Sequence, residues 1–130
     1  MIAAALLLLG GPEAQNETLL QRVEIEGQSA EGGEGRLILR KQGGKESCRI
    51  AATHFGETGL ADYVFDFDSV LLSATRTEIR YSGPITAEPL KIQSRRTERL
   101  DGEEAKAGFE EHRALFGAEH LARCGKAAAK

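Results

Sequence analysis

The sequence of 130 residues has no tryptophan, three prolines and two cysteines, and its longest wholly apolar run has nine residues. A run of nine is too short to span a bilayer as a helix. Two cysteines alone do not make a metal site, and a net charge of −3 does not favour a nucleic-acid partner. What remains is a globular chain of ordinary composition that is long enough to bury a core.

The apolar run, MIAAALLLL, opens the sequence and is followed by small and then polar residues. This order is typical of a secretory signal peptide, although no Lys or Arg precedes the run. We expect a signal peptide over residues 1–14, one domain over residues 16–126 and a frayed tail over residues 127–130. The alternative for the first segment is an N-terminal helix packed on the core. Export predicts a periplasmic or extracellular location.

Cys48 and Cys124 favour the same location, because two cysteines in a small exported domain most often form a disulfide. The loop that they would close is long, and chain entropy assigns such a crosslink about 4.5 kcal/mol of stability. The alternatives are two buried free thiols or a reactive one.

Strand patterns fill the sequence between residues 21 and 100. Gly43 and Gly44 accept the positive φ angles of a two-residue hairpin turn. With that turn, the predicted cross-strand pairs are Lys41 with Glu46, Leu39 with Cys48, and Leu37 with Ile50.

The segment LADYVFDFD alternates aromatic and acidic residues. Tyr63, Phe65 and Phe67 are expected to face the core, with Asp62 and Asp66 on the solvated face of a hairpin. A turn at Asp68–Ser69 predicts the pairs Phe67 with Val70, Phe65 with Leu72, and Tyr63 with Ala74.

Along the return strand the apolar residues change from even to odd positions, ending with Ile79 and Tyr81. A β-bulge near Thr75–Thr77 would produce this change. It would also place Arg76 and Arg80 on the outer face of the sheet.

The pattern changes to a helical one at Asp101, which can cap a helix that ends at Cys124. An apolar stripe of roughly helical spacing follows, and Gly117 can mark a break in it. The stripe comprises Phe109, Leu115, Phe116 and Leu121. The predicted fold class is therefore α+β, an antiparallel β-meander of five or six strands covered on one face by a C-terminal helix. The predicted disulfide would join that helix to the sheet.

No catalytic constellation, metal site or cofactor motif is recognisable, and we expect a protein that is not an enzyme. His54 is interpreted as a partly buried structural residue, and His112 as part of a solvated helix face. An enzyme would have to combine His54 with Glu57 or Asp66.

Basic residues are the least ordinary feature of the predicted sheet. We expect a stripe on its outer face that binds an acidic surface of a partner protein, because arginines on a rigid sheet are good anchors. The alternative is that these residues pair with nearby carboxylates and only keep the sheet hydrated. The stripe comprises Arg76, Arg80, Lys91, Arg95 and Arg99.

Three motifs follow one another between residues 49 and 85: FGETG at Phe55–Gly59, YVFDF at Tyr63–Phe67 and YSGPI at Tyr81–Ile85. They resemble a pattern of small exported bacterial proteins of uncharacterised function. In that pattern an FGE-G loop leads to an aromatic strand and a Y-x-x-P-I turn. The sequence departs from it at Arg96–Gly102, where a second aromatic strand would follow. The resemblance implies an exported α+β domain and carries no site.

Two functions fit these observations. The first is an exported, non-enzymatic domain of the inhibitor or immunity type that acts on another protein. The alternative is a small-ligand or envelope-component binder with a pocket between sheet and helix, where Gly108 and Gly117 would leave room.

Overall fold

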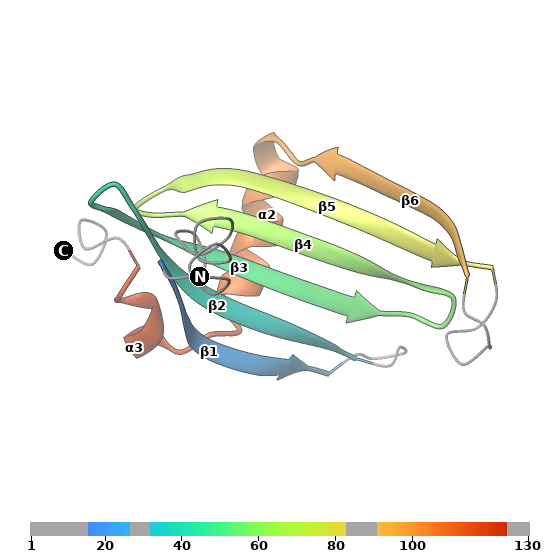
Figure 1. Cartoon of the computed structure of the whole chain (residues 1–130), viewed down its shortest axis with the longest axis horizontal. Coiled ribbons are helices and arrows are strands. Elements are labelled where there is room, and N and C mark those ends of the chain that lie inside the picture. Colours follow the sequence, from blue (N-terminus) through green and yellow to red (C-terminus); the bar gives the residue numbers. More distant parts are fainter. Residues whose placement is uncertain (1–15, 27–31, 83–90, 125–130) are drawn as a thin grey trace, which may run out of the picture.

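Six antiparallel strands follow one another in chain order across a single sheet (Figure 1). The structure is a computed structural model that describes residues 16–26, 32–82 and 91–124. The strands are β1 (Glu17–Ile25), β2 (Gly33–Gln42), β3 (Lys45–Phe55), β4 (Gly59–Phe67), β5 (Leu71–Tyr81) and β6 (Ile92–Arg99). The helices α2 (Gly102–Arg113) and α3 (Ala118–Leu121) come after them. The expected signal peptide over residues 1–14 and tail over residues 127–130 lie outside the described residues.

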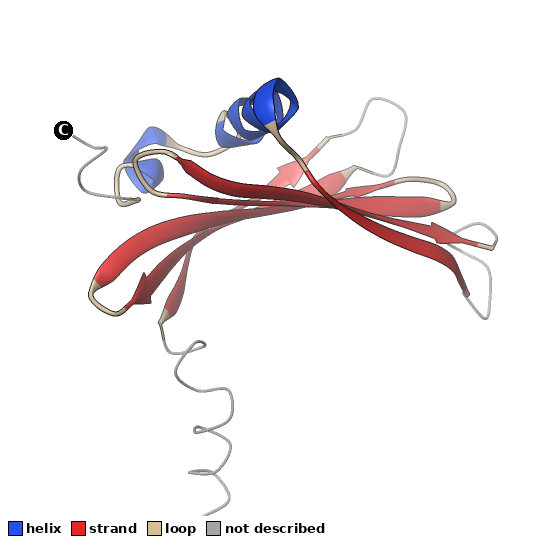
Figure 2. Cartoon of the chain, turned by 90° about the horizontal axis from the view of Figure 1, so that it is seen from above, coloured by secondary structure: helices blue, strands red, loops and turns tan. Residues whose placement is uncertain are grey.

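Both helices lie on one side of the sheet, and the described residues form no helix on the other side (Figure 2). The fold is therefore α+β, as predicted. The single helix expected over residues 101–124 is instead two short ones, because the chain turns after Ala114. Gly117 has an extended backbone there, and its N–H donates to the side chain of Gln21 on β1 at 2.9 Å.

The core lies between α2, α3 and the helix-bearing face of the sheet. Phe65, Leu37, Ile50 and Cys48 are the largest side chains that are fully buried, and all four come from the central strands. The two-residue alternation predicted for these strands places them on one face. Phe65, Leu37 and Ile50 each contribute about 1.5–3 kcal/mol by removal of their side chains from water.

The β2–β3 hairpin confirms its predicted register. Lys41 pairs with Glu46, Leu39 with Cys48, and Leu37 with Ile50. Gly43 and Gly44 have φ angles of 56° and 81°, which L side chains rarely adopt. The turn chemistry therefore fixed the pairing of both strands.

The predicted register of the β4–β5 hairpin is wrong. The turn contains Asp68, Ser69 and Val70, because the Asp68 carboxylate accepts the backbone N–H of Val70 at 3.0 Å. The ladder is also irregular between Asp66 and Phe67. The observed pairs are Phe67 with Leu71, Phe65 with Ala74, and Tyr63 with Arg76.

The bulge lies at the start of β5 and not near Thr75–Thr77, so the faces of β5 differ from the prediction. Arg76 and Arg80 lie on the helix-bearing face, in line with Ala74. Ile79 and Tyr81 lie on the opposite face, which we call the far face. Val70 and Leu72, which were expected in the core, are 62% and 50% exposed.

The far face carries the aspartates, as predicted. Arg49 pairs with Asp66 across β3 and β4. Its Nε and Nη2 donate to the two carboxylate oxygens at 2.7 and 3.0 Å. The second aspartate, Asp62, accepts a hydrogen bond from Thr53. Both aspartates are half-buried by their neighbours on the strands and are not fully hydrated.

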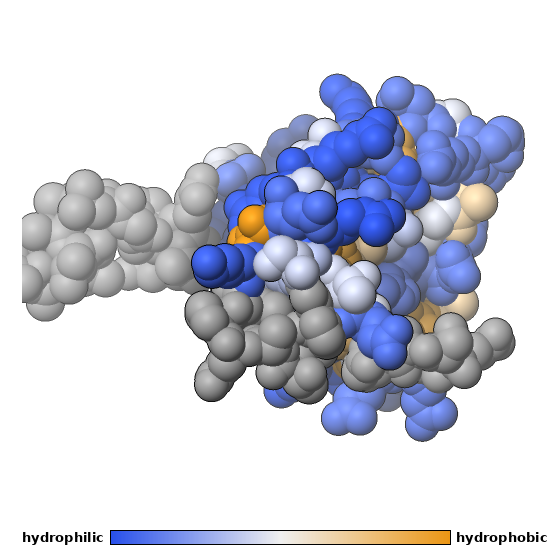
Figure 3. All heavy atoms as spheres, turned by 90° about the vertical axis from the view of Figure 1, so that its right-hand side faces the viewer, coloured by the Kyte–Doolittle hydropathy of each residue, from blue (hydrophilic) through white to orange (hydrophobic). Residues whose placement is uncertain are grey.

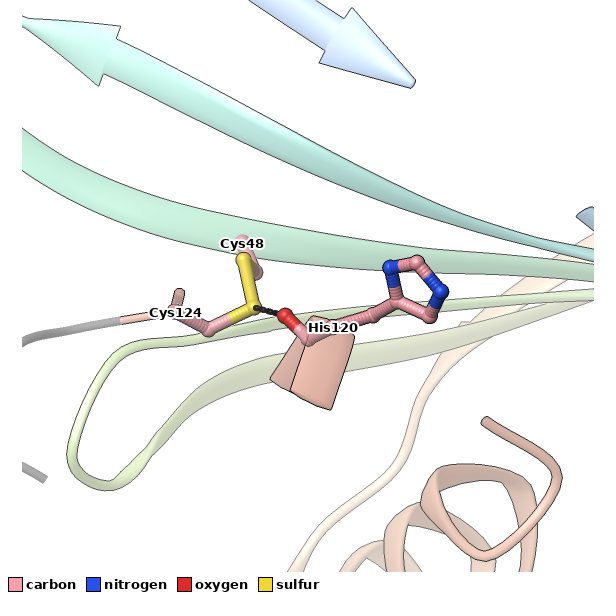
Figure 4. The surroundings of a disulfide bond; sticks show 3 residues. All are labelled: Cys48, His120 and Cys124. Atoms are coloured by element: carbon pink, nitrogen blue, oxygen red, sulfur yellow. Dashed lines mark hydrogen bonds between the residues drawn. A yellow bond between two sulfur atoms is a disulfide. The ribbon is translucent and has the colours of Figure 1, made fainter. Parts of the chain in front are cut away.

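A disulfide joins Cys48 on β3 to Cys124, just after α3, which confirms the predicted pair (Figure 4). Both cysteines are buried, with exposed fractions of 0% and 3%. The bond attaches the C-terminal end of the described chain to the middle of the sheet.

Candidate functional site

The predicted basic stripe is not one surface. Arg76 and Arg80 pair with Glu98 and Ser94 on the helix-bearing face, whereas Arg95 pairs with Ile79 on the far face. Arg99 pairs with Thr75 and so lies on the far face with Arg95. Lys91 precedes β6 and is exposed. The shifted bulge in β5 is the physical reason for the division.

The side of the molecule at the right of Figure 1 is mostly hydrophilic, with apolar atoms in small areas between polar ones (Figure 3). The β3–β4 turn forms part of this side. No broad apolar patch is visible among the described residues in this view.

A pair of histidines joins the sheet to α2. The Nε2 atom of His54, at the end of β3, lies 2.9 Å from the Nε2 atom of His112 on α2. The Nδ1 atom of His112 lies 2.7 Å from the carbonyl oxygen of Gly108. Because a carbonyl only accepts, Nδ1 of His112 carries the hydrogen. In the neutral pair, Nε2–H of His54 therefore donates to Nε2 of His112.

His112 is 4% exposed, so the prediction that it belongs to a solvated helix face is wrong. Its ring lies 5.0 Å from that of Tyr63 and 5.2 Å from that of Phe65, measured between centroids. His54 meets Tyr63 edge to face at 5.5 Å. The rings of the two histidines thus pack against the aromatic side chains of Tyr63 and Phe65 on β4.

The pKa of His54 is lowered, chiefly by burial and further by the neighbouring His112, while Glu111 acts in the opposite direction. His54 is therefore neutral at pH 7. Its Nδ1 atom then carries a lone pair, which can accept a hydrogen bond.

Arg76 lies beside this pair, in the row formed by Tyr63, Arg76 and Glu98 on β4, β5 and β6. Its Nη2 donates to Glu98, and its Nη1 lies 3.7 Å from the carboxylate of Glu104 on α2. The hydrogen bond to Glu98, followed by one to Tyr63, raises the pKa of Arg76. The Nε atom of Arg76 is buried, and among the described residues it has no hydrogen-bond partner.

These groups surround a cavity of about 430 Å³ between α2 and the sheet. Its polar lining comes from His54, Tyr63, Arg76, Glu104, Glu111 and His112. Leu100, Ala61 and Ala107 supply apolar surface, and Gly108 leaves room at the helix. The pocket expected between sheet and helix is thus present at Gly108, but Gly117 does not line it.

The cavity offers more acceptors than donors. The charged residues of its lining are Arg76, Glu104 and Glu111. Arg76 already contacts Glu104 and also Glu98, which lies outside the lining. The neutral His54 adds the lone pair of Nδ1. Within the described ranges, no three His, Cys, Asp or Glu side chains are grouped so as to hold a metal ion.

Of the residues considered for an enzyme, Glu57 lines a cavity together with His54, whereas Asp66 lies apart from them. Asp66 lies on the far face with Arg49, whereas His54 lies on the helix-bearing face. Glu57 shares a second cavity, of about 280 Å³, with His54 at the β3–β4 turn. The Nε2 atom of His54 is already engaged by His112.

The sequence contained one signal for the site that the prediction missed. Ala105, Phe109, His112 and Phe116 are spaced by four, three and four residues and are all buried. This spacing follows one face of a helix, so it places His112 on the buried side.

None of the described helices combines the length and the apolar character that crossing a membrane requires. The resemblance of residues 49–85 to small exported proteins stays a prediction. Comparisons of the whole chain with protein families, with curated proteins and with solved structures found no match.

Proposed function

We propose that this chain is a binding domain without catalytic activity, and that the cavity beside α2 holds a small ligand with a positively charged, hydrogen-bond-donating group. The observation that carries the proposal is the hydrogen-bonded pair of His54 and His112 at the wall of the 430 Å³ cavity. A cavity of several hundred cubic ångströms with a few polar groups is typical of small-molecule sites.

The charges of the lining support an amine over an acid. Glu104 and Glu111 outnumber Arg76, and Arg76 is neutralised by its carboxylate contacts. The rings of Tyr63 and His54 supply flat surfaces on which an organic cation can lie. The exposed position of Glu111 leaves it available to a ligand.

Titration with benzylammonium, followed by NMR, tests this proposal, with benzoate as the anion of the same shape. We expect benzylammonium to shift the resonances of His54, Gly108 and His112. Glu111→Gln should weaken binding about two- to fivefold, which corresponds to an exposed charge contact of up to 1 kcal/mol. Glu103→Gln is the control, since Glu103 is exposed on α2 and does not line the cavity. Equal shifts with benzoate, or none with either compound, would contradict the proposal.

The second candidate function is an exported domain of the inhibitor or immunity type, which acts on a partner protein. The basic strand β6 favours it, because Arg95, Arg96 and Arg99 are exposed at the edge of the sheet. The disulfide supports export, since such bonds persist in oxidising compartments. Inhibition assays against a panel of extracellular hydrolases test this function, and a panel without any inhibition would count against it.

A further inference from the structure

The edge of the sheet at β6 offers unpaired backbone groups. β6 is the last strand in the sheet order, and it pairs only with β5 among the described residues. Seven of its eight residues are exposed, the exception being Glu98. An exposed strand edge can accept another strand through main-chain hydrogen bonds.

The pairing with β5 shows which backbone groups face outward. The N–H of Leu100 donates to the carbonyl of Ala74 at 2.9 Å, and the register continues unbroken to the pair of Arg80 and Ser94. Antiparallel pairs alternate between hydrogen-bonded and non-hydrogen-bonded. The backbone groups of Glu98 and Arg96 therefore point to β5, and those of Arg99, Thr97 and Arg95 point to the free edge.

The charges of this edge are strongly one-sided. Four basic residues lie along this edge, and β6 contains one carboxylate, that of Glu98, which already binds Arg76. The basic residues are Lys91, which precedes β6, and Arg95, Arg96 and Arg99 within it. Arg99 also lies 3.8 Å from the exposed Asp101. Two copies of β6 side by side would bring like charges together, which disfavours pairing with a second copy. An acidic strand has the complementary charge.

We propose that an extended acidic segment of a partner protein adds to β6 as a seventh strand. This inference rests on the second candidate function and names its docking surface and the chemistry of the partner. The backbone groups of Arg95, Thr97 and Arg99 supply the hydrogen bonds, and the basic side chains select acidic residues.

The probe is an eight-residue peptide of alternating Glu and Val, and a peptide with Lys in place of Glu is its control. Calorimetry should show binding of the acidic peptide, weakening with added salt, and no binding of the basic one. Hydrogen exchange should slow at the amides of Arg95, Thr97 and Arg99 when the acidic peptide is bound.

Two matched variants separate backbone pairing from charge attraction. Thr97→Pro removes one outward N–H without removing a backbone hydrogen bond to β5, and should weaken binding at least tenfold. It also removes the side-chain hydrogen bond of Thr97 to Thr77 on β5, which the matched Thr97→Ala variant loses as well. Thr97→Ala keeps that N–H and should bind like the original chain. If Thr97→Pro does not fold, the exchange pattern of the original chain still decides the question.

Docking at β6 is overturned if the acidic peptide does not bind, if the basic peptide binds equally well, or if protection appears elsewhere. It is also overturned if folded Thr97→Pro binds like Thr97→Ala. The benzylammonium titration reports on His54 and His112, so a failure at β6 is distinguishable from a failure of the cavity. If a hydrolase is inhibited equally by the original chain and by Thr97→Pro, the second candidate function stands, but its contact surface is not β6.

Discussion

His54 and His112 are linked by their Nε2 atoms across 2.9 Å, and this contact joins the end of β3 to the last turn of α2. The two residues are 58 positions apart in the sequence. Their contact is one of the few polar connections between the helix and the sheet among the described residues. Removing either ring should therefore affect both the attachment of α2 and the cavity beside it.

His112→Ala should lower the free energy of unfolding by about 2–4 kcal/mol. The substitution leaves a void beside Tyr63 and Phe65 and removes the acceptor of His54. Urea denaturation of the variant measures the loss. His120→Ala is the control, because His120 is half-exposed on α3 and should cost less than about 1 kcal/mol. Equal losses in the two variants would contradict the structural role given to His112.

Stability should fall as the pH drops below about 6.5, the ordinary pKa of a histidine. Because the pKa of His54 is lowered in the folded chain, the unfolded chain binds this proton more tightly. The loss should begin near the ordinary value and level off below the lowered one. Urea midpoints at pH 7.5 and pH 5 measure it, and His54→Gln should show a smaller difference. An unchanged pH dependence in His54→Gln would refute the assignment to this residue.

Replacement of both cysteines by alanine should lower the free energy of unfolding by about 3–5 kcal/mol, because the disulfide closes a loop with a sequence separation of 76. The chain that has been reduced in denaturant should match this variant in its urea midpoint. Both sulfurs are buried, so the folded chain should resist a mild reductant. A midpoint that is unaffected by the double substitution would contradict the expected contribution.

Two glycines should differ in their tolerance of alanine. A Cβ at Gly59 would lie 2.2 Å from the carbonyl oxygen of Ile79, so Gly59→Ala must displace β4 from β5. We expect it to cost about 2–3 kcal/mol. At Gly44 a Cβ meets nothing, and the positive φ alone should cost about 1–2 kcal/mol. Thermal unfolding ranks the two, and a larger loss at Gly44 would contradict the close approach of the strands.

Much of the fold was predictable because the signals are local. The glycine pair of the β2–β3 turn set the register of its hairpin, and alternation identified the buried face of β4. The β4–β5 turn was not predictable in the same way. Its register depends on the carboxylate of Asp68, which favours three turn residues over two, and on an irregular ladder next to the turn. One extra residue reverses the faces of everything that follows.

The candidate site was not predictable from strand patterns alone. Arg76 belongs to it only because the bulge lies before Ala74 and not after it. The contact of His54 with His112 depends on where α2 crosses the sheet, which no local pattern specifies. The spacing of the buried residues of α2 placed His112 on the inner side of the helix, but it did not name its partner.

The Cys48–Cys124 bond also determines how the chain responds to mechanical force. A pull applied to the two ends passes along β1, β2 and the start of β3 to Cys48, and from there directly through the sulfur–sulfur link to Cys124. The strands β4, β5 and β6 and both helices lie between the two cysteines and would bear no tension. Under stretching, β6 and the part of the cavity formed by β4, β5 and α2 would thus keep their shape while β1 and β2 detached from the sheet.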